Sequence, residues 1–121
     1  MENRRSGPRH VIAFPVRVNW KDENGQDLME EGLTENVGPN GALIFLPRLL
    51  PDVGSKVKLT VTENPKDEIS VSAEVLRLER NAAHPQAALQ VTKSIKVWKE
   101  KVWSYAGSLL DKEEPEVFDD W

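Results

Sequence analysis

The chain has 121 residues, of which 39% are hydrophobic and 30% charged, and it contains no cysteine. This length suits one globular domain, and the absence of cysteine excludes disulfides and thiolate chemistry. Two histidines, His10 and His84, are too few for a histidine-rich metal site, and we interpret both as solvated. No apolar run approaches the roughly 20 residues that span a bilayer, and the first residues lack the apolar segment of a secretory signal. We therefore expect a cytoplasmic protein without membrane insertion.

The charge is unevenly distributed along the chain. The net charge is −4, but residues 111–121 hold six acids and one lysine, so residues 1–110 carry +1. Basic residues gather at the front, at Arg4, Arg5 and Arg9. A nearly neutral body with a basic front end suits a small anionic ligand better than a nucleic-acid polymer, which needs many phosphate contacts.

The first predicted strand covers residues 12–20, where apolar residues from Ile12 to Trp20 alternate with a period of two. Pro15 lies within it and lacks an N–H group, which predicts an edge position or an irregularity there. Residues 21–27 form the next turn, since they contain an Asn-Gly pair.

A weaker strand is predicted near residues 31–37, with Leu33, Glu35 and Val37 on one face. Farther along, apolar residues alternate from Ile69 but change phase at Leu76, which predicts a β-bulge or a sharp barrel bend. The other predicted strands cover residues 42–46, residues 56–62 and a last segment containing Ala87, Leu89 and Val91.

From Ser94 to Leu110 the apolar spacing changes to three and four, which predicts a helix with Ser94 as its N-cap. We expect Trp98 and Trp103 to dock this helix on the sheet rather than to stack on a ligand. The apolar stripe consists of Ile95, Trp98, Val102, Tyr105 and Leu109.

Six short strands and one helix predict a mostly β fold, a six-stranded antiparallel β-barrel with a C-terminal α-helix over one mouth or one side. Residues 1–11 are expected to be a flexible basic arm, residues 12–110 the barrel and helix, and residues 111–121 an acidic, disordered tail. The chain is not expected to be an enzyme. It has no nucleophile elbow, P-loop or dinucleotide fingerprint, and neither histidine has a visible nucleophile partner.

Arg5 and Arg9 are spaced as RxxxR, and two guanidiniums four positions apart suggest an anion grip. Three segments together resemble the PilZ domain family over about residues 4–110. They are Arg4-Arg5-Ser-Gly-Pro-Arg9, Phe14-Pro-Val-Arg-Val18 and Thr34-Glu-Asn-Val-Gly-Pro-Asn-Gly-Ala-Leu-Ile44. That family is marked by RxxxR on an N-terminal arm and by [D/N]xSxxG at a strand start, on a six-stranded barrel with a C-terminal helix.

The resemblance implies binding of the bacterial second messenger cyclic di-GMP, with no other cofactor and no metal. Arg5 and Arg9 would bridge its phosphates and guanines, because arginine reads the N7 and O6 acceptors of guanine bidentately. Asn36 would bind a guanine edge, and Gly41 would allow a tight turn and a close backbone approach. In some members an arginine just ahead of RxxxR accompanies binding of two stacked ligand molecules, and Arg4 occupies that position.

One position departs from the family pattern, because Gly38 stands where the family has serine. Losing a hydrogen bond to a charged or buried group costs on the order of 1–3 kcal/mol, or roughly ten- to a hundredfold in affinity. A backbone N–H group or a water molecule could compensate in part.

Two functions therefore stay open. The first is a cyclic di-GMP sensor whose arm orders on binding and alters a surface for an unknown protein effector. The second is a degenerate PilZ-like adaptor that binds protein only. For the adaptor, Phe118 and Trp121 of the acidic tail could be a docking segment, although that tail also reads as a solvated chain end. A nucleic-acid-binding barrel is disfavoured by the net charge and by the absence of aromatic and basic strand faces.

Overall fold

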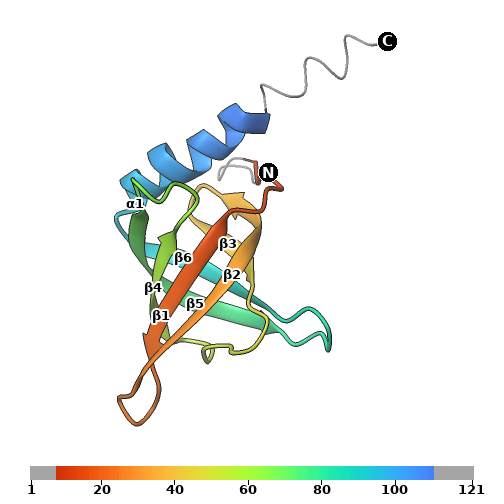
Figure 1. Ribbon diagram of the computed structural model, residues 1–121, viewed down its shortest axis with the longest axis vertical. Coiled ribbons are helices and arrows are strands. Elements are labelled where there is room, and N and C mark those ends of the chain that lie inside the picture. Colours follow the sequence, from red (N-terminus) through yellow and green to blue (C-terminus); the bar gives the residue numbers. More distant parts are fainter. Residues whose placement is uncertain (1–7, 111–121) are drawn as a thin grey trace, which may run out of the picture.

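Six antiparallel strands close into a barrel in the computed structural model, which describes residues 8–110 (Figure 1). The strands follow the order β1-β2-β3-β6-β5-β4, and β4 pairs with β1 to complete the closure. The predicted fold is confirmed. The strands are β1 Pro15–Lys21, β2 Asp27–Gly38, β3 Gly41–Phe45, β4 Lys56–Val61, β5 Ile69–Glu79 and β6 Gln86–Lys93.

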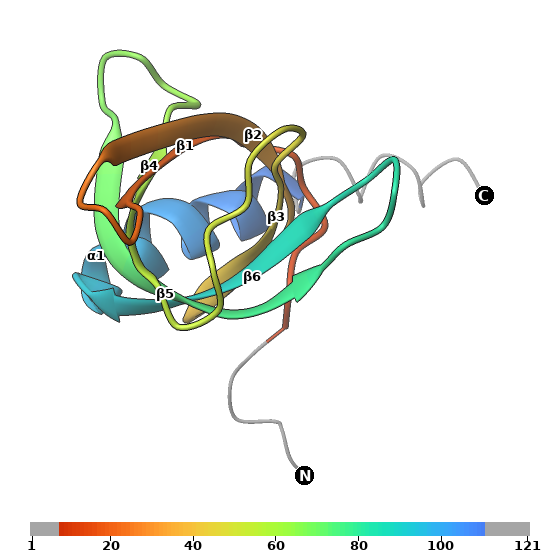
Figure 2. The same ribbon diagram turned by 90° about the horizontal axis from the view of Figure 1, so that it is seen from below.

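The helix begins after β6 and crosses one mouth of the barrel (Figures 1 and 2). It consists of α1 Ile95–Val97, the wider π-helical segment η2 Trp98–Trp103, and further α-helical residues 104–110. Ser94 precedes it, but the Ser94 backbone is left-handed, with φ 64°, and its side chain makes no capping hydrogen bond. Ser94 is thus the N-cap residue, as predicted, but it does not cap the helix through its side chain.

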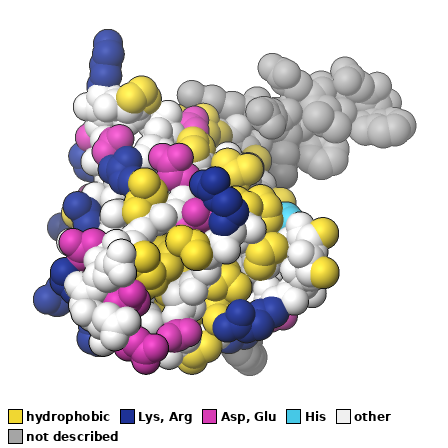
Figure 3. Space-filling view, turned by 60° about the horizontal axis from the view of Figure 1, so that its bottom comes forward, with side chains coloured by type: hydrophobic (Ala, Val, Ile, Leu, Met, Phe, Trp, Pro, Cys, Tyr) yellow, Lys and Arg dark blue, Asp and Glu magenta, His cyan; other side chains and the backbone are white. Residues whose placement is uncertain are grey.

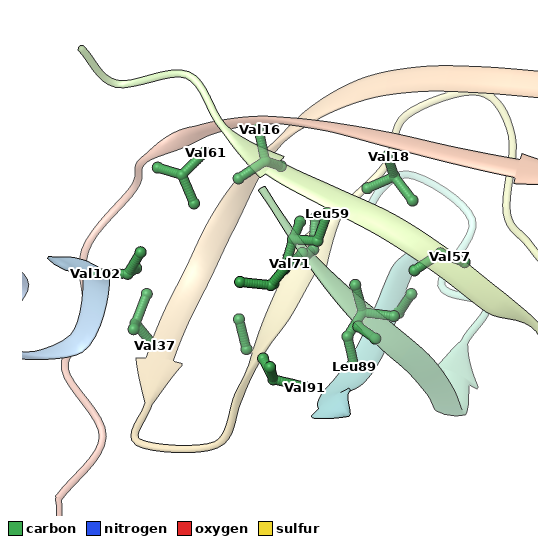
Figure 4. Packing of buried hydrophobic residues seen from close by; sticks show 14 of the residues in the cluster. Val16, Val18, Val37, Val57, Leu59, Val61, Val71, Leu89, Val91 and Val102 are labelled. Carbon is green, nitrogen blue, oxygen red and sulfur yellow. The ribbon is translucent and has the colours of Figure 1, made fainter. Parts of the chain in front are cut away.

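The core fills the barrel interior with β-branched and other aliphatic side chains, and the helix closes it from above. Val102 of η2 reaches down toward Val37 and Val61 at the barrel mouth (Figure 4). Trp98 is completely buried, as predicted for a core anchor. Ile95 and Tyr105 of the predicted stripe are instead 39% and 43% exposed, and Ala106 is buried. The π-helical turn shifts which residues face the barrel.

Three register shifts mark the strands that carry the site. In the pairing of β5 with β6, one lies between Ser72 and Ala73 and another between Val75 and Arg77, where the sequence predicts a bulge. The shift in β2 lies between Thr34 and Asn36 and was not expected. It places Leu33 outside and Val37 inside the barrel, so the prediction that these two share a face is wrong.

Pro15 is the first residue of β1 and pairs with Leu33 of β2. A closed barrel has no edge strand, so the edge position that Pro15 suggested is wrong. The first position of a strand tolerates proline, because its missing N–H group leaves the interior of the ladder intact.

Candidate functional site

The segment 8–14 is docked beside the end of β2. His10 and Val37 exchange two backbone hydrogen bonds of 2.8 Å. The hydroxyl of Thr34 donates to the carbonyl oxygen of Ile12 at 2.5 Å and accepts from the backbone N–H of Phe14 at 2.8 Å. Residues 8–11 of the predicted arm are therefore attached to the barrel. Residues 1–7 of that arm, and the predicted tail 111–121, lie outside the described residues.

This docking brings the two sequence motifs together. Arg9 Nε donates to Asn36 Oδ1 at 2.7 Å. The same guanidinium lies against Gly38, where an added Cβ would come within 2.5 Å of Arg9 Nη1 and 3.0 Å of its Cζ. Arg9 thus occupies space that opens because position 38 carries no side chain. The structure thus places the second arginine of RxxxR beside the turn motif.

The charge of Arg9 is held in an unfavourable environment. Burial lowers the pKa of its guanidinium from the ordinary value, and the positive charge of Arg77 lowers it further. No carboxylate among residues 8–110 forms an ion pair with Arg9. Arginine stays protonated at physiological pH even so. The position is therefore suited to an anion that compensates two neighbouring cations.

Arg77 belongs to the same outer surface, although the sequence did not single it out. Strand register places Asn36, Leu43, Ala88 and Arg77 in one row across β2, β3, β6 and β5. Cross-strand neighbours point to the same face of a sheet. An apolar floor of Leu43 and Ala88 thus separates Asn36 from Arg77, whose Nε donates to Glu79 Oε2 at 3.0 Å. The predicted bulge before Arg77 was the available signal, because it turns this side chain outward.

Gly41 is required by the packing of the barrel. A Cβ at this position would collide with the carbonyl oxygen of Leu89 and approach the Cα of Gln90 to 3.2 Å, so β3 and β6 lie too close for a side chain. Gly41 also pairs with Gly38 across the turn at Pro39 and Asn40. The close backbone approach that the structure shows at Gly41 is one between strands, and the contact of Gly41 with a ligand stays a prediction.

Two indoles of the helix hold the two halves of the site. Trp98 Nε1 donates to the carbonyl oxygen of Gly38, and Trp103 Nε1 donates to that of Pro8, both at 2.8 Å. The ring of His10 stacks on Trp103 with 5.7 Å between centroids. Trp103 therefore contacts the arm as well as the hydrophobic core, against which it packs as predicted.

Both histidines make specific contacts, although His84 is exposed, as predicted, and His10 is only partly buried. His10 is held between Trp103 and β2, as described above. His84, in the β5–β6 loop, bonds to the carboxylate of Glu35 and stacks on Phe45, with 4.3 Å between ring centroids. Glu35 is the extra residue of the β2 bulge, so this contact lies next to Asn36.

Of the predicted ligand residues, the structure describes Arg9, Asn36, Gly38 and Gly41 and places them at one end of β2 and β3. Arg4 and Arg5 lie outside the described residues, so their predicted roles stay predictions. Within residues 8–110, no cluster of acidic and histidine side chains could hold a metal ion, and no helix is long and apolar enough to cross a membrane.

A six-stranded barrel with an arginine arm against an Asn-Gly turn is the arrangement that the sequence motifs predicted. The family model of the PilZ domain matches residues 3–97, and the chain therefore belongs to the PilZ domain family. No curated protein matches the sequence.

Solved structures of PilZ domains have the same fold. The PilZ domain with c-di-GMP of YcgR from Escherichia coli gives a TM-score of 0.70 at 12% identity, covering 99% of this chain and 100% of that domain. MotI/DgrA, the Bacillus subtilis inhibitor of motility, gives 0.70 at 15% identity, covering 93% of this chain and 54% of that one. The PilZ domain of CeSA from a cellulose-synthesizing bacterium gives 0.61 at 16% identity, covering 85% and 98%. The chain thus spans only about half the length of MotI/DgrA.

Proposed function

We propose that this PilZ domain binds cyclic di-GMP on the outer face of β2, β3, β5 and β6. The observation that carries the proposal is the contact of Arg9 with Asn36 beside Gly38, because it unites residues of both motifs on one surface. Complexes of c-di-GMP with the PilZ domain of YcgR and with Klebsiella MrkH support the choice of ligand.

The chemistry of the surface fits the ligand. Arg5 and Arg9 contact its phosphates and guanine edges, since guanidinium forks match both kinds of acceptor. Asn36 forms hydrogen bonds with a guanine edge, and Gly38 and Gly41 line the turn. Arg4 contacts a second ligand molecule where two are bound. The apolar floor between Asn36 and Arg77 gives a base a surface on which to lie.

Two residues of the site, Arg9 and Asn36, are bonded to each other in the structure. Arg9 occupies the acceptor oxygen of Asn36, so binding requires this hydrogen bond to be exchanged for contacts with the ligand. The carbonyl oxygens of Pro8 and Gly38 are both held by indoles of the helix. Movement of Arg9 therefore reaches the helix directly, and we propose that the helix transmits the ligand state to a protein effector.

A nucleic-acid polymer is a poorer partner for this domain. On the one face of the molecule that Figure 3 shows, basic side chains are interspersed with acidic ones instead of forming one continuous tract. Polymers of phosphate bind through many simultaneous cationic contacts. A ligand with two phosphates needs far fewer.

Calorimetric titration with cyclic di-GMP tests the proposal. Arg5→Ala and Arg9→Ala are each expected to weaken binding at least tenfold, because each removes a charge-assisted contact worth about 1.5–3 kcal/mol. Arg17→Ala is the matched control, since Arg17 lies on β1 in an exposed ion pair with Glu68 and should bind as the parent does.

Two outcomes would contradict this assignment in different ways. Absence of heat and of any chemical-shift change at saturating ligand would favour the protein-binding adaptor. That alternative has one observation in its favour, because Gly38 removes the serine hydroxyl and Arg9 fills its place. Binding that survives both arginine substitutions would support cyclic di-GMP as the ligand but would contradict the assignment of Arg5 and Arg9 to its site.

A further inference from the structure

A hollow separate from the candidate site lies beside the helix, and Phe14, the last residue of segment 8–14, belongs to its lining. Its volume is about 310 Å³, and it opens between η2 and the β4–β5 loop. Figure 2 shows that loop and the N-terminal arm on opposite sides of the helix, which crosses the barrel mouth between them. The floor is apolar and consists of Phe14, Val61, Ile69, Val102 and Tyr105.

The rim of this helix–loop pocket is acidic. Glu63 and Asp67 of the loop and Glu100 of the helix surround it, with Lys101 as the one amine in its lining. None of the three carboxylates forms an ion pair with a partner among the described residues. An apolar floor under unpaired carboxylates suits a bulky apolar side chain with cationic neighbours.

The size of the hollow favours one anchoring side chain over a whole small molecule. Ligand pockets span about 300–1,000 Å³, so this one is at the lower limit. Protein interfaces concentrate their binding energy in such anchors, seated in small pockets and enriched in aromatic residues and arginine. Tyr105 is 43% exposed and stacks on Phe14, which adds a ring face on which a guanidinium can lie.

The pocket shares its walls with the arm. Phe14 ends the segment that carries Arg9, and the hydroxyl of Thr34 fixes its backbone N–H. Val102 lies in the pocket floor, while the next residue, Trp103, holds the carbonyl oxygen of Pro8. A shift of residues 8–14 therefore displaces two walls of the pocket at once.

The π-helical segment makes this double contact possible. Ser104 N donates to Lys99 O, a bond that spans five residues. In a regular α-helix, at about 100° per residue, Trp98 and Trp103 would point about 140° apart. The wider turn lets both indoles reach the arm and the Gly38 turn on one side, while Glu100 and Lys101 still line the pocket on the other.

We propose that the helix–loop pocket docks a protein segment in which a bulky apolar side chain is flanked by Arg or Lys, and that the arm controls this docking. The control by the arm rests on the proposed function, whereas the docking does not. The pocket is thus the effector surface of the domain.

Amide chemical shifts of the full chain, titrated with the blocked peptide acetyl-Arg-Phe-Lys-amide, test the docking. Shifts are expected in residues 63–69 and 99–106, and a variant with both Asp67→Lys and Glu100→Lys should bind at least tenfold more weakly. Glu23→Lys, in the exposed β1–β2 turn at the far end of the barrel, is the matched control and should change nothing. All three positions are exposed, so these variants are expected to fold.

Three results would overturn the docking. The first is equal binding of acetyl-Glu-Phe-Glu-amide, which keeps the ring and reverses the charge. The second is equal binding of agmatine, because a free small cation would then suffice. The third is a concentration-dependent shift of the same residues without peptide, which would assign the pocket to a second copy of the chain.

The control by the arm has its own readout. Saturating cyclic di-GMP is expected to change the peptide Kd at least threefold, and Arg9→Ala should abolish that change. If cyclic di-GMP binds without altering the peptide Kd, the control of docking by the arm is rejected, whereas peptide docking in the helix–loop pocket is not affected. Cyclic di-GMP that does not bind would reject the proposed function, and peptide binding would still decide the docking.

Discussion

Arg9 and Gly38 share one small space at the end of β2. The guanidinium lies where a side chain at position 38 would extend, and its Nε is bonded to Asn36. Arg9 therefore fills the space that a serine side chain at position 38 would take, and its observed position depends on glycine there. The proposed ligand and Arg9 Nε would therefore compete for the same acceptor, Asn36 Oδ1.

Gly38→Ser is expected to raise the affinity for cyclic di-GMP about tenfold. A serine Cβ displaces the flexible end of Arg9, which frees Asn36, and its hydroxyl adds a hydrogen bond worth about 1 kcal/mol or more. Calorimetric titration measures the change. Ala83→Ser adds a hydroxyl in the exposed β5–β6 loop and should leave affinity unchanged. Weaker binding by the serine variant would show that Arg9 needs its resting position.

Arg77→Gln is expected to weaken cyclic di-GMP binding about three- to tenfold, because it removes a cation that faces Asn36 across the apolar floor. Unfolding temperature should stay near that of the parent, since the side chain of Arg77 is 62% exposed. Arg80→Gln, just beyond the end of β5, serves as the charge-matched control. Identical titrations for the two variants would exclude Arg77 from the site.

The sequence predicted Asn36 and Gly41 because both belong to a short motif with fixed spacing. It did not predict Arg77, which joins the site only through the pairing of β3, β6 and β5. The phase break at Leu76 indicated a bulge, but its consequence for the next side chain required the neighbouring strands. The spacing of the motif thus identifies Asn36 and Gly41, whereas Arg77 can be assigned to the candidate site only from the strand pairing.

The arm and β2 act as one element because a buried threonine joins them. Thr34 bonds to two backbone groups of the arm, and its side chain lies in the bulged part of β2. Residues 31–37 show only a weak strand pattern, since the bulge breaks the alternation on which strand prediction depends. The helix shows the same limit. Its apolar spacing fits a regular α-helix, and nothing in that spacing indicates the π-helical segment from Trp98 to Trp103.

Thr34→Val is expected to lower the free energy of unfolding by about 1–3 kcal/mol, because it leaves the Phe14 N–H without its acceptor in a buried position. It should also weaken cyclic di-GMP binding, since the arm loses an attachment. Chemical denaturation and calorimetry measure both effects. Thr60→Val is the control at an equally buried threonine whose hydroxyl contacts only Ser70. If the ligand affinity falls equally in both variants, the attachment of the arm to Thr34 does not contribute to ligand binding.

At the scale of the whole molecule, the barrel is closed and the helix seals one mouth with Trp98, Val102 and Ala106. Period-two patterns predicted this architecture well, because each strand has one buried face. Closure also explains why Pro15 has no edge position, one of the two alternatives that the sequence suggested, and lies instead at the start of β1. The candidate site lies on the outer face of the barrel, so substitutions of its residues leave no cavity in the core.

Ligand binding should therefore stabilise the whole domain. At a cyclic di-GMP concentration of about 100 times Kd, mass action adds about 2.7 kcal/mol, which corresponds to a rise in Tm of about 10 °C for a domain of this size. Differential scanning calorimetry measures the rise, and Arg9→Ala should reduce it. An unchanged Tm under these conditions would contradict binding to the folded state.

The π-helical segment also affects how related sequences are compared. Because its bonds span five residues, η2 contains more residues per turn than the α-helical stretches on either side. A relative with a regular helix in this place would reach the same final position with one residue fewer. Ungapped alignment of such a pair would match Trp103 with a position on the wrong side of the helix. A single-residue gap within 98–103 would restore the equivalence, so the indole that holds the arm is best located from structure.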